Sequence, residues 1–312
     1  MKFFIIGGTG FIGGPLIRHL IRTGHEATAL ARTVSRVEYL PPQAAPLVDD
    51  PLKPGKWQDI AGQADVIINL AGRPIMTRWT KTARKEIVES RILATRMAVE
   101  AIPPDRAEQM TLINANAVGY YGDSGDSLIT EKSSPGKGFL AEVAQQWQQE
   151  AEAASEKGAR VIIPRFGAVL GRGGGALAQM LPPFRLGLGG RLGSGNQWFS
   201  WIHMHDLVKA LLFVAENNKL AGVVNMCSPE PVTNMELTRT LAKVLNRPAI
   251  LPVPGIILKL AIGGSAEIAL KGQRVFPEIL KRAGFIFDFP SLEAALRDLI
   301  GNGDSSSSDG LR

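Results

Sequence analysis

The chain has only one cysteine, Cys227, among its 312 residues. A single thiol excludes an intrachain disulfide, which is typical of proteins in a reducing compartment, so we expect a cytoplasmic location. The sequence also lacks an apolar run of membrane-spanning length, because Ile256–Ile262 is short and carries Lys259. The apolar residues that follow Met1 end at Gly7, too soon for the core of a signal peptide. We therefore expect no membrane segment and no membrane as a partner.

Runs of like charge are also missing. The net charge is +6, yet the Lys and Arg residues are scattered along the chain. The sequence thus lacks the basic arm that is typical of many nucleic-acid-binding proteins, and we expect no nucleic-acid partner. A mildly basic enzyme that attracts an anionic cofactor fits the charge better. With 45% hydrophobic and 21% charged residues, the composition is that of a globular protein.

The first turn of the chain carries a nucleotide-binding pattern. The apolar run Phe3–Ile6 predicts a buried strand, and apolar residues at helical spacing follow Gly13. Between them stands Gly7-Gly8-Thr9-Gly10-Phe11-Ile12-Gly13, a turn of the kind that holds the pyrophosphate of a dinucleotide in a parallel sheet. Gly7 permits the tight turn, Gly10 lets the backbone approach the pyrophosphate, and Gly13 lets helix and strand pack closely. We expect a cofactor site here.

The end of the second predicted strand indicates which cofactor binds. An NAD-specific site places Asp or Glu about 20 residues beyond the glycines, where it holds the ribose 2′-hydroxyl. This chain has Ala31 and Arg32 at that place, with Arg36 close behind. A guanidinium suits the 2′-phosphate of NADP(H), because it donates two parallel hydrogen bonds to a dianion. The alternative is a solvated arginine at a strand end.

Strands and helices alternate along most of the chain, which predicts an α/β fold with a Rossmann-type doubly wound parallel sheet and a smaller C-terminal cap domain. We assign residues 1–165 and 198–228 to an NADP-binding Rossmann domain, residues 166–197 and 229–300 to a C-terminal substrate or cap region, and residues 301–312 to a disordered tail. A proline-rich connection lies between the second and third strands. The predicted strands are Phe3–Ile6, Ala27–Ala31, Asp65–Leu70, Thr111–Ile113, Arg160–Pro164, Trp198–His203 and Gly222–Met226, and the predicted later helices are Thr80–Ala101, Phe139–Lys157 and His205–Glu216.

Several motifs beyond the glycine turn are more specific. The chain resembles the extended, or atypical, short-chain dehydrogenase/reductase superfamily over roughly residues 1–300, and most closely an epimerase-family branch of it. Members of that branch are variously labelled nucleotide-sugar epimerase-like, NADP-binding, or SulA-type cell-division inhibitor. The motifs that carry the resemblance are Asn69-Leu70-Ala71-Gly72, Arg78-Trp79, Val118-Gly119-Tyr120-Tyr121-Gly122, Val169-Leu170-Gly171-Arg172-Gly173-Gly174-Gly175, the run Pro183–Gly190, Trp201-Ile202-His203 and the C-terminal segment Leu251–Val275.

The resemblance implies a Rossmann fold that binds NADP(H), with no metal. Glu86 and Arg91 belong to this expectation with the alternative that they are surface charges of a helix. The contacts that the resemblance implies for the cofactor come from Gly7, Thr9, Gly10, Phe11, Ile12, Gly13, Arg32, Leu70, Ala71, Glu86, Arg91 and Val169.

The superfamily's usual proton relay is missing. In that relay a Tyr exchanges a proton with the substrate, a Lys four residues later lowers the pKa of the Tyr, and a Ser steadies the substrate oxygen. None of the three tyrosines has a lysine four residues later. On the helix where the pair is expected, Phe139 and Val143 occupy the positions, and Asn114 or Asn116 stands where the Ser is expected.

Two functions remain open. The first is an NADP-dependent oxidoreductase or epimerase-like enzyme that acts on an unidentified small molecule with a substitute acid, for which the candidates are Tyr120, Tyr121, His203 and Glu142. The tyrosines could instead pack in a loop, and His203 could cap the helix that follows it. The second is a non-catalytic NADP(H)-binding regulatory protein with a protein partner, linked to cell division as one label of the branch implies.

The C-terminal third predicts a cap. Residues 233–300 do not continue the strand–helix alternation, and with the glycine-rich segment Gly187–Gly195 they are expected to close a cleft over the nicotinamide. Arg185, Arg191 and Arg274 would then meet an anionic substrate or the cofactor phosphates. The alternative is a passive helical extension on the flank of the sheet.

Overall fold

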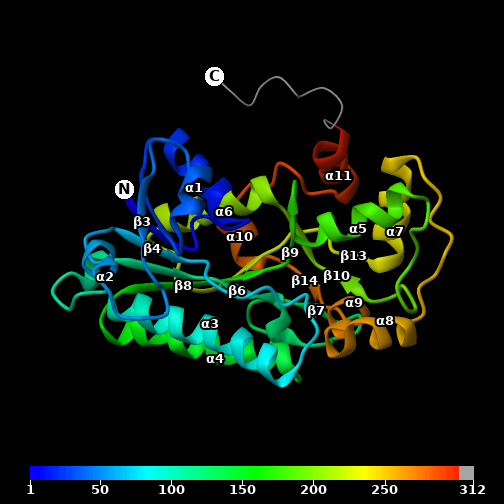
Figure 1. Cartoon of the computed structure of the whole chain (residues 1–312), viewed down its shortest axis with the longest axis horizontal. Coiled ribbons are helices and arrows are strands. Elements are labelled where there is room, and N and C mark those ends of the chain that lie inside the picture. The colour runs from blue at the N-terminus through cyan, green and yellow to red at the C-terminus, as the bar shows by residue number, and fades with distance from the viewer. Residues whose placement is uncertain (302–312) are drawn as a thin grey trace.

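A parallel sheet forms the centre of the molecule. The computed structural model describes residues 1–301, and its largest sheet has eight strands in the order β12-β8-β5-β4-β1-β2-β3, with β6 paired to β8 (Figure 1). The order reverses beside β1, as in a doubly wound Rossmann-type sheet, and this confirms the predicted fold class. The predicted tail lies almost wholly outside the described residues. The strands are β1 Lys2–Ile6, β2 Glu26–Ala31, β3 Ala45–Val48, β4 Val66–Asn69, β5 Thr111–Asn114, β6 Asn116–Ala117, β8 Arg160–Phe166 and β12 Gly222–Met226.

Helices cover both faces of this sheet, which is why its strands are apolar throughout rather than alternating. On one face α1 (Gly13–Arg22), α6 (Met204–Glu216) and α10 (Glu278–Arg282) contribute to a core that includes Phe3 and Ile5. On the other, α2 (Trp57–Ala61), α3 (Lys81–Glu100) and α4 (Phe139–Glu156) cover Phe4 and Ile6 (Figure 1). Burying one such side chain contributes roughly 1.5–3 kcal/mol to the free energy of unfolding. The sheet is therefore a rigid support for the loops at its carboxyl edge.

The proline-rich connection contains a strand that the sequence pattern did not indicate. β3 pairs with β2 in parallel register and includes Pro46. A proline lacks the N–H that a central strand needs, but β3 is at the edge of the sheet, where one side of the backbone is unpaired. A short 3-10 helix, Val34–Tyr39, precedes it.

The predicted strand Trp198–His203 is two strands, and neither belongs to the main sheet. β10 (Trp198–Phe199) pairs antiparallel with β13 (Val232–Thr233), and β11 (Trp201–His203) pairs parallel with β9 (Ala168–Gly171). Ser200 lies between the two strands. Its hydroxyl donates a hydrogen bond to the Gln273 carbonyl and accepts one from the Val275 amide. The chain thus changes sheets at Ser200.

A further core holds the C-terminal elements together. It contains Leu177, Trp201, Leu241 and Leu296, all buried, and lies at the end of the molecule opposite β3 (Figure 1). α7 begins with a capping box between Thr233 and Glu236. The elements of this region are α5 Gly175–Arg185, α7 Asn234–Leu245, α8 Gly255–Ile262, α9 Glu267–Leu270, α11 Leu292–Gly301, and β14 Arg274–Val275, which pairs with β7 Leu128–Ile129; short 3-10 helices span Ala107–Gln109, Val118–Tyr121 and Gly263–Ala266.

Candidate nucleotide-binding site

The glycine turn is built as the sequence pattern predicts. Gly7 has a φ of +82°, which favours glycine, and its carbonyl accepts a hydrogen bond from the Gly10 amide at 3.0 Å. A Cβ on Gly13 would stand 2.7 Å from the backbone of Gly8, so a side chain there would displace the turn. A Cβ on Gly10 would lie 3.1 Å from the Gly7 oxygen. The turn is therefore a tight backbone loop at the carboxyl end of β1.

The N-terminus of α1 faces this loop without a side-chain cap. The N-cap residue is Ile12, no side chain accepts a hydrogen bond from the first amides, and the first turn has no acidic residue. Uncapped amides together with the helix dipole attract an anion such as a phosphate. The glycines thus leave space for a pyrophosphate, and the helix supplies the positive end of a dipole.

The loop after β4 lies against the glycine turn. A Cβ on Gly7 would stand 3.2 Å from the backbone of Leu70 and Ala71. The Ala71 amide donates to the Asn69 side-chain oxygen at 3.1 Å, which holds the loop in place. The structure therefore brings Leu70 and Ala71 to the same edge as Gly7.

Asn69 belongs to a buried polar network that the sequence analysis did not assign. Its Nδ2 donates to Asn114 Oδ1 at 2.8 Å and to Thr95 Oγ1 at 3.1 Å. Trp147 Nε1 donates to the same threonine hydroxyl at 2.8 Å. The network ties β4, β5, α3 and α4 together beneath the edge of the sheet. A polar residue that ends an apolar strand, as Asn69 and Asn114 do, was the signal in the sequence.

Arg32 and Arg36 lie beyond the end of β2, beside the glycine turn. Both are exposed, and neither forms an ion pair within the described part of the chain. β2 pairs with β1 so that Leu30 is opposite Ile6, which places Arg32 next to the turn that begins at Gly7. The Arg32 guanidinium, without a carboxylate partner in the described residues, therefore lies beside the turn, and Arg36 follows in the 3-10 helix after β2.

Phe11 joins the glycine turn to a distant segment. Its ring lies against Gly171, Gly174 and Gly175, where a Cβ on Gly175 would stand 2.8 Å from the ring. Gly171 ends β9, Gly174 and Gly175 follow it, and Val169 on that strand pairs with Ile202 of β11. Phe11, Ile12 and Val169 all pack against the same apolar core. The glycine-rich segment after Leu170 is thus the surface on which Phe11 packs.

Arg91 and Glu86 come from the same helix but have different surroundings. The Arg91 guanidinium lies against Gly72 and over the Trp147 ring at 5.0 Å, and Nη1 donates to the Ile87 carbonyl. Burial lowers the pKa of Arg91 to about 10. Glu86 forms an ion pair with Arg73 instead, and both side chains are 42% exposed. Arg91 thus faces the loop after β4, whereas Glu86 takes part in a surface pair.

The two tyrosines pack around a buried arginine. The Arg165 guanidinium, 2% exposed, lies 3.4 Å from the centre of the Tyr120 ring. The Tyr121 hydroxyl donates to Asn225 Oδ1 at 2.7 Å. Burial raises the pKa of Tyr121 to about 12. Tyr121 is thus held in the interior, and its hydroxyl is already engaged.

His203 caps a helix, as the alternative in the sequence analysis had it. Its Nδ1 accepts from the His205 amide at the start of α6, and its Nε2 lies 3.3 Å from Asp298 Oδ2. Its ring stacks on Phe289 with 4.0 Å between centroids. Burial lowers the pKa of His203, against the attraction of Asp298.

The residues that the sequence analysis places at the relay positions are apolar and packed. Phe139, at the start of α4, meets the Trp79 indole, and Val143 is 4% exposed. Asn116 is buried and donates to the Ala144 carbonyl at 2.9 Å. Glu142 lies beside them on α4 but is exposed.

The three arginines predicted for the cap have separate neighbours. The Arg185 carbonyl accepts from Arg247 Nε, Arg191 donates to the Gly193 carbonyl, and Arg274 lies over the Trp198 ring at 4.7 Å. The Gly187–Gly195 segment is itself packed, since the Gly193 amide donates to the Val253 carbonyl at 2.9 Å.

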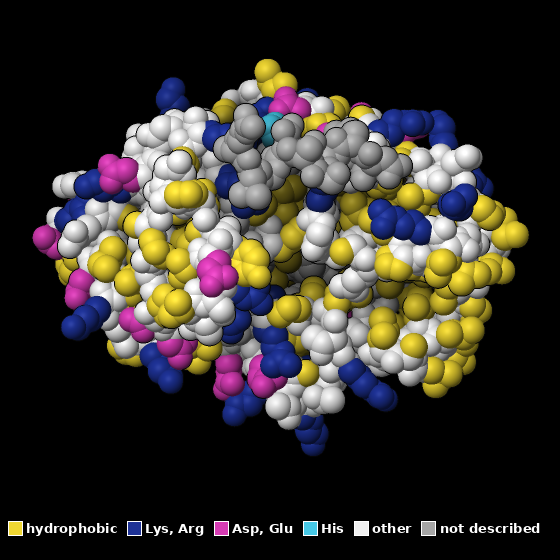
Figure 2. Space-filling view, turned by 45° about the horizontal axis from the view of Figure 1, so that its top comes forward, with side chains coloured by type: hydrophobic (Ala, Val, Ile, Leu, Met, Phe, Trp, Pro, Cys, Tyr) yellow, Lys and Arg dark blue, Asp and Glu magenta, His cyan; other side chains and the backbone are white. Residues whose placement is uncertain are grey.

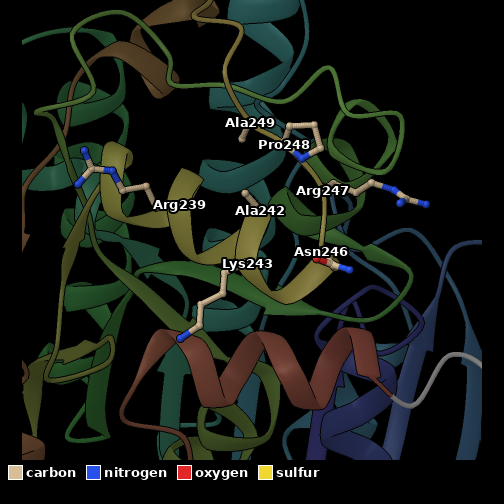
Figure 3. A pocket seen from close by; sticks show the side chains of 7 residues that line it. All are labelled: Arg239, Ala242, Lys243, Asn246, Arg247, Pro248 and Ala249. Carbon is tan, nitrogen blue, oxygen red and sulfur yellow. The ribbon is translucent and has the colours of Figure 1, made fainter.

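A surface hollow lies elsewhere on the molecule. It encloses about 500 Å³ along α7 and the residues after it, at the other end of the molecule from the glycine turn. Figure 3 shows that the side chains of Arg239, Lys243 and Arg247 diverge from one another. Lys243 is paired with Glu293 at 2.8 Å. This hollow is therefore separate from the predicted cofactor site.

Two further observations concern residues 1–301. No group of three His, Cys, Asp or Glu side chains in this part of the chain could hold a metal ion. No helix in the same residues is long and apolar enough to cross a membrane.

Comparisons with known proteins extend this description. Residues 3–227 match the NAD dependent epimerase/dehydratase family, and residues 253–299 match a domain of unknown function, DUF1731. The epimerase family protein SDR39U1 homolog, chloroplastic, of Arabidopsis thaliana is 40% identical over 306 residues, which are 96% of this chain and 87% of that protein. Epimerase family protein YfhF of Bacillus subtilis is 37% identical over 309 residues, covering 96% and 98% of the two chains. The crystal structure of human epimerase family protein SDR39U1 (isoform 2) with NADPH has a TM-score of 0.84 and 34% identity, and covers 97% of this chain and 100% of that one.

Proposed function

The chain belongs to the NAD dependent epimerase/dehydratase family, and we propose that it is an NADP(H)-binding protein of the short-chain dehydrogenase/reductase type that works without a Tyr-Lys relay. The family resemblance drawn from the sequence is thereby confirmed. The observation that carries the proposal is the uncapped α1 N-terminus behind the glycine turn, with the unpaired Arg32 beside it. The human protein with NADPH in its crystal structure supports the choice of cofactor.

The residues present fit such a cofactor. The backbone of Gly10–Gly13 would hold the pyrophosphate, and Thr9 would contribute a hydroxyl next to it. Arg32 would bind the 2′-phosphate, with Arg36 as a second cation nearby. Leu70 and Ala71 would line the site on the β4 side, and Phe11, Ile12 and Val169 would close its apolar wall. Bound NADP(H) would supply or accept a hydride.

Arg91 is the charged group that we place nearest to the reacting end of the site. Its guanidinium lies on Gly72, directly after the Leu70–Ala71 loop, and within the described residues it has no carboxylate partner. It would orient a carbonyl or phosphate oxygen by donating hydrogen bonds. Glu86 contributes indirectly, because its pair with Arg73 restrains the same loop.

Cofactor choice is the direct test. Fluorescence titration of the purified protein should give tighter binding of NADPH than of NADH, by about 1–3 kcal/mol if Arg32 engages the 2′-phosphate with charge-assisted hydrogen bonds. Arg32→Ala should remove most of that preference and leave NADH binding nearly unchanged, with Arg18→Ala on α1 as a control. Equal affinities for both cofactors in the unmutated protein would contradict the assignment.

The surroundings of the candidate acids favour a second function, that of a non-catalytic NADP(H)-binding protein. Phe139 and Val143 cannot titrate, Tyr121 is bonded to Asn225, and His203 caps α6. A non-catalytic protein that reports the NADP(H) state to a protein partner needs no acid, and a link to cell division stays a prediction within this alternative. Incubation of the NADPH complex with carbonyl compounds and nucleotide sugars discriminates: any loss of NADPH absorbance supports the enzyme, with Tyr120 and Glu142 then the acids to substitute first.

We also propose that residues 166–197 and 229–300 form the substrate or cap region. In support, these segments share a core, and the turn Gly263–Ala266 lies on Trp79 from the first half of the chain. Hydrogen exchange with NADPH should then show added protection in Gly187–Gly195 and around Arg274 as well as in Gly7–Gly13. Protection confined to the first half would favour a passive extension. A cytoplasmic location is proposed on the buried, unpaired Cys227 alone.

A further inference from the structure

A patch of exposed aliphatic side chains covers α8 and the two segments beside it. Within residues 1–301, seven of the 15 large apolar side chains that are markedly exposed are in this patch. α8 itself has no buried residue. The members of this apolar patch are Leu186, Leu188, Ile250, Leu251, Ile256, Ile257 and Leu260, each between 47% and 79% exposed.

Backbone contacts make the patch continuous. The Leu251 amide donates to the Gly189 carbonyl, and Leu192 forms a parallel bridge with Val253. The segment after α5 and the segment after α7 therefore run side by side and lead into α8. Figure 2 shows hydrophobic side chains gathered on this end of the molecule. Contiguous exposed apolar surface of this kind marks a docking site.

The chain segments that form the patch carry cations and no carboxylate. Residues 157–205 and 237–266 contain no Asp or Glu. Arg185, Arg247 and Lys259 are exposed at the patch, and none of them forms an ion pair in the described part of the chain. Figure 3 shows the Arg247 side chain extending away from the body of the molecule. Apolar residues mixed with cations, and without anions, complement a surface that is apolar beneath and negative at its boundary.

We infer that this apolar patch docks on the surface of a bilayer that contains anionic lipid, with α8 lying in the plane of the interface. A helix of eight residues is about 12 Å long and cannot cross a bilayer, but it can insert its aliphatic side chains among the acyl chains. The cations then contact the headgroups. A second copy of the chain suits the patch less well, because a two-fold contact would oppose the same cations with no carboxylate between them.

Vesicle co-sedimentation of the full-length protein tests the inference. The protein should pellet with phosphatidylcholine vesicles that contain phosphatidylglycerol, less with pure phosphatidylcholine, and less again at high salt. Leu260→Glu should weaken binding about tenfold or more, because it places a carboxylate in the buried face. The matched control is Ile286→Glu, since Leu260 and Ile286 are both 76% exposed, and it should bind as the unmutated protein does.

Charge reversal gives an independent test. Lys259→Glu should weaken binding to the anionic vesicles, whereas Lys219→Glu, exposed but remote in sequence, should not. Absence of pelleting, or equal loss with Leu260→Glu and Ile286→Glu, would overturn the inference. A dimer in light scattering that Leu260→Glu dissociates would also overturn it, in favour of a second copy on the patch.

Discussion

The Trp79 indole and the Phe139 ring meet edge to face, with 4.9 Å between their centroids. Phe139 begins α4, where the sequence analysis expects the tyrosine of the superfamily's relay, and the Arg84 guanidinium lies 4.8 Å from the centre of the same ring. An aromatic ring and a cation thus both pack against this ring. The start of α4, where that tyrosine is expected, is a packed cluster.

Introduction of the relay's tyrosine at Phe139 should therefore be tolerated, whereas introduction of its lysine at Val143 should not. Phe139→Tyr adds one hydroxyl at a half-buried ring and should change the free energy of unfolding by less than about 1.5 kcal/mol. Val143→Lys places an ammonium where the side chain is 4% exposed and should cost several kcal/mol, of the order of 3. Urea unfolding of both variants measures this, and a stable Val143→Lys protein would refute the packing argument.

Substitution by alanine should have different effects on NADPH binding at the neighbouring Gly13 and Gly14. A Cβ on Gly13 would collide with the backbone of Gly8, whereas on Gly14 the nearest atom is Arg18 Nη1 at 3.7 Å. Gly13→Ala should distort the turn and abolish NADPH binding. Gly14→Ala should leave binding intact and raise stability by about 0.5–1 kcal/mol, because alanine suits a helix better than glycine. NADPH titration and thermal unfolding check the pair, and equal effects would count against the described turn.

Substitution by phenylalanine should lower the free energy of unfolding more at Tyr121 than at Tyr120. Tyr121→Phe leaves the buried Asn225 oxygen without its donor and should lower the free energy of unfolding by about 1–3 kcal/mol. Tyr120→Phe keeps the ring under Arg165 and should cost less than about 0.5 kcal/mol. If an activity is found, loss of turnover in Tyr120→Phe with unchanged stability would identify that hydroxyl as the acid.

His203 should make stability depend on pH. Burial lowers its pKa in the folded state below the ordinary 6.5, so in mildly acidic solution the unfolded chain binds a proton that the folded chain does not. Stability should therefore fall as the pH drops below about 6.5, and level off once the folded-state pKa is passed. His19 contributes in the same direction, since burial lowers its pKa too.

Substitution of His203 distinguishes its contribution to the pH dependence from that of His19. His203→Asn retains a capping acceptor for α6 but cannot titrate, so its unfolding free energy should decline less between pH 7 and 5 than that of the unmutated protein. The same decline in both proteins would assign the pH dependence to other groups.

The sequence by itself determined the strand–turn–helix at the N-terminus, the fold class and the position of Arg32 beside the turn. These features depend on local rules: a glycine at a positive φ, apolar runs that are covered on both faces, and a residue that follows directly on a strand. Tertiary structure alone decided the contacts between distant segments. The Phe11 ring on Gly171–Gly175, the Tyr121 bond to Asn225 and the Arg165 guanidinium between two tyrosines each join residues that lie far apart in the sequence. Such contacts follow from how the whole chain packs, because each side chain takes the space and the hydrogen-bond partners that its neighbours leave.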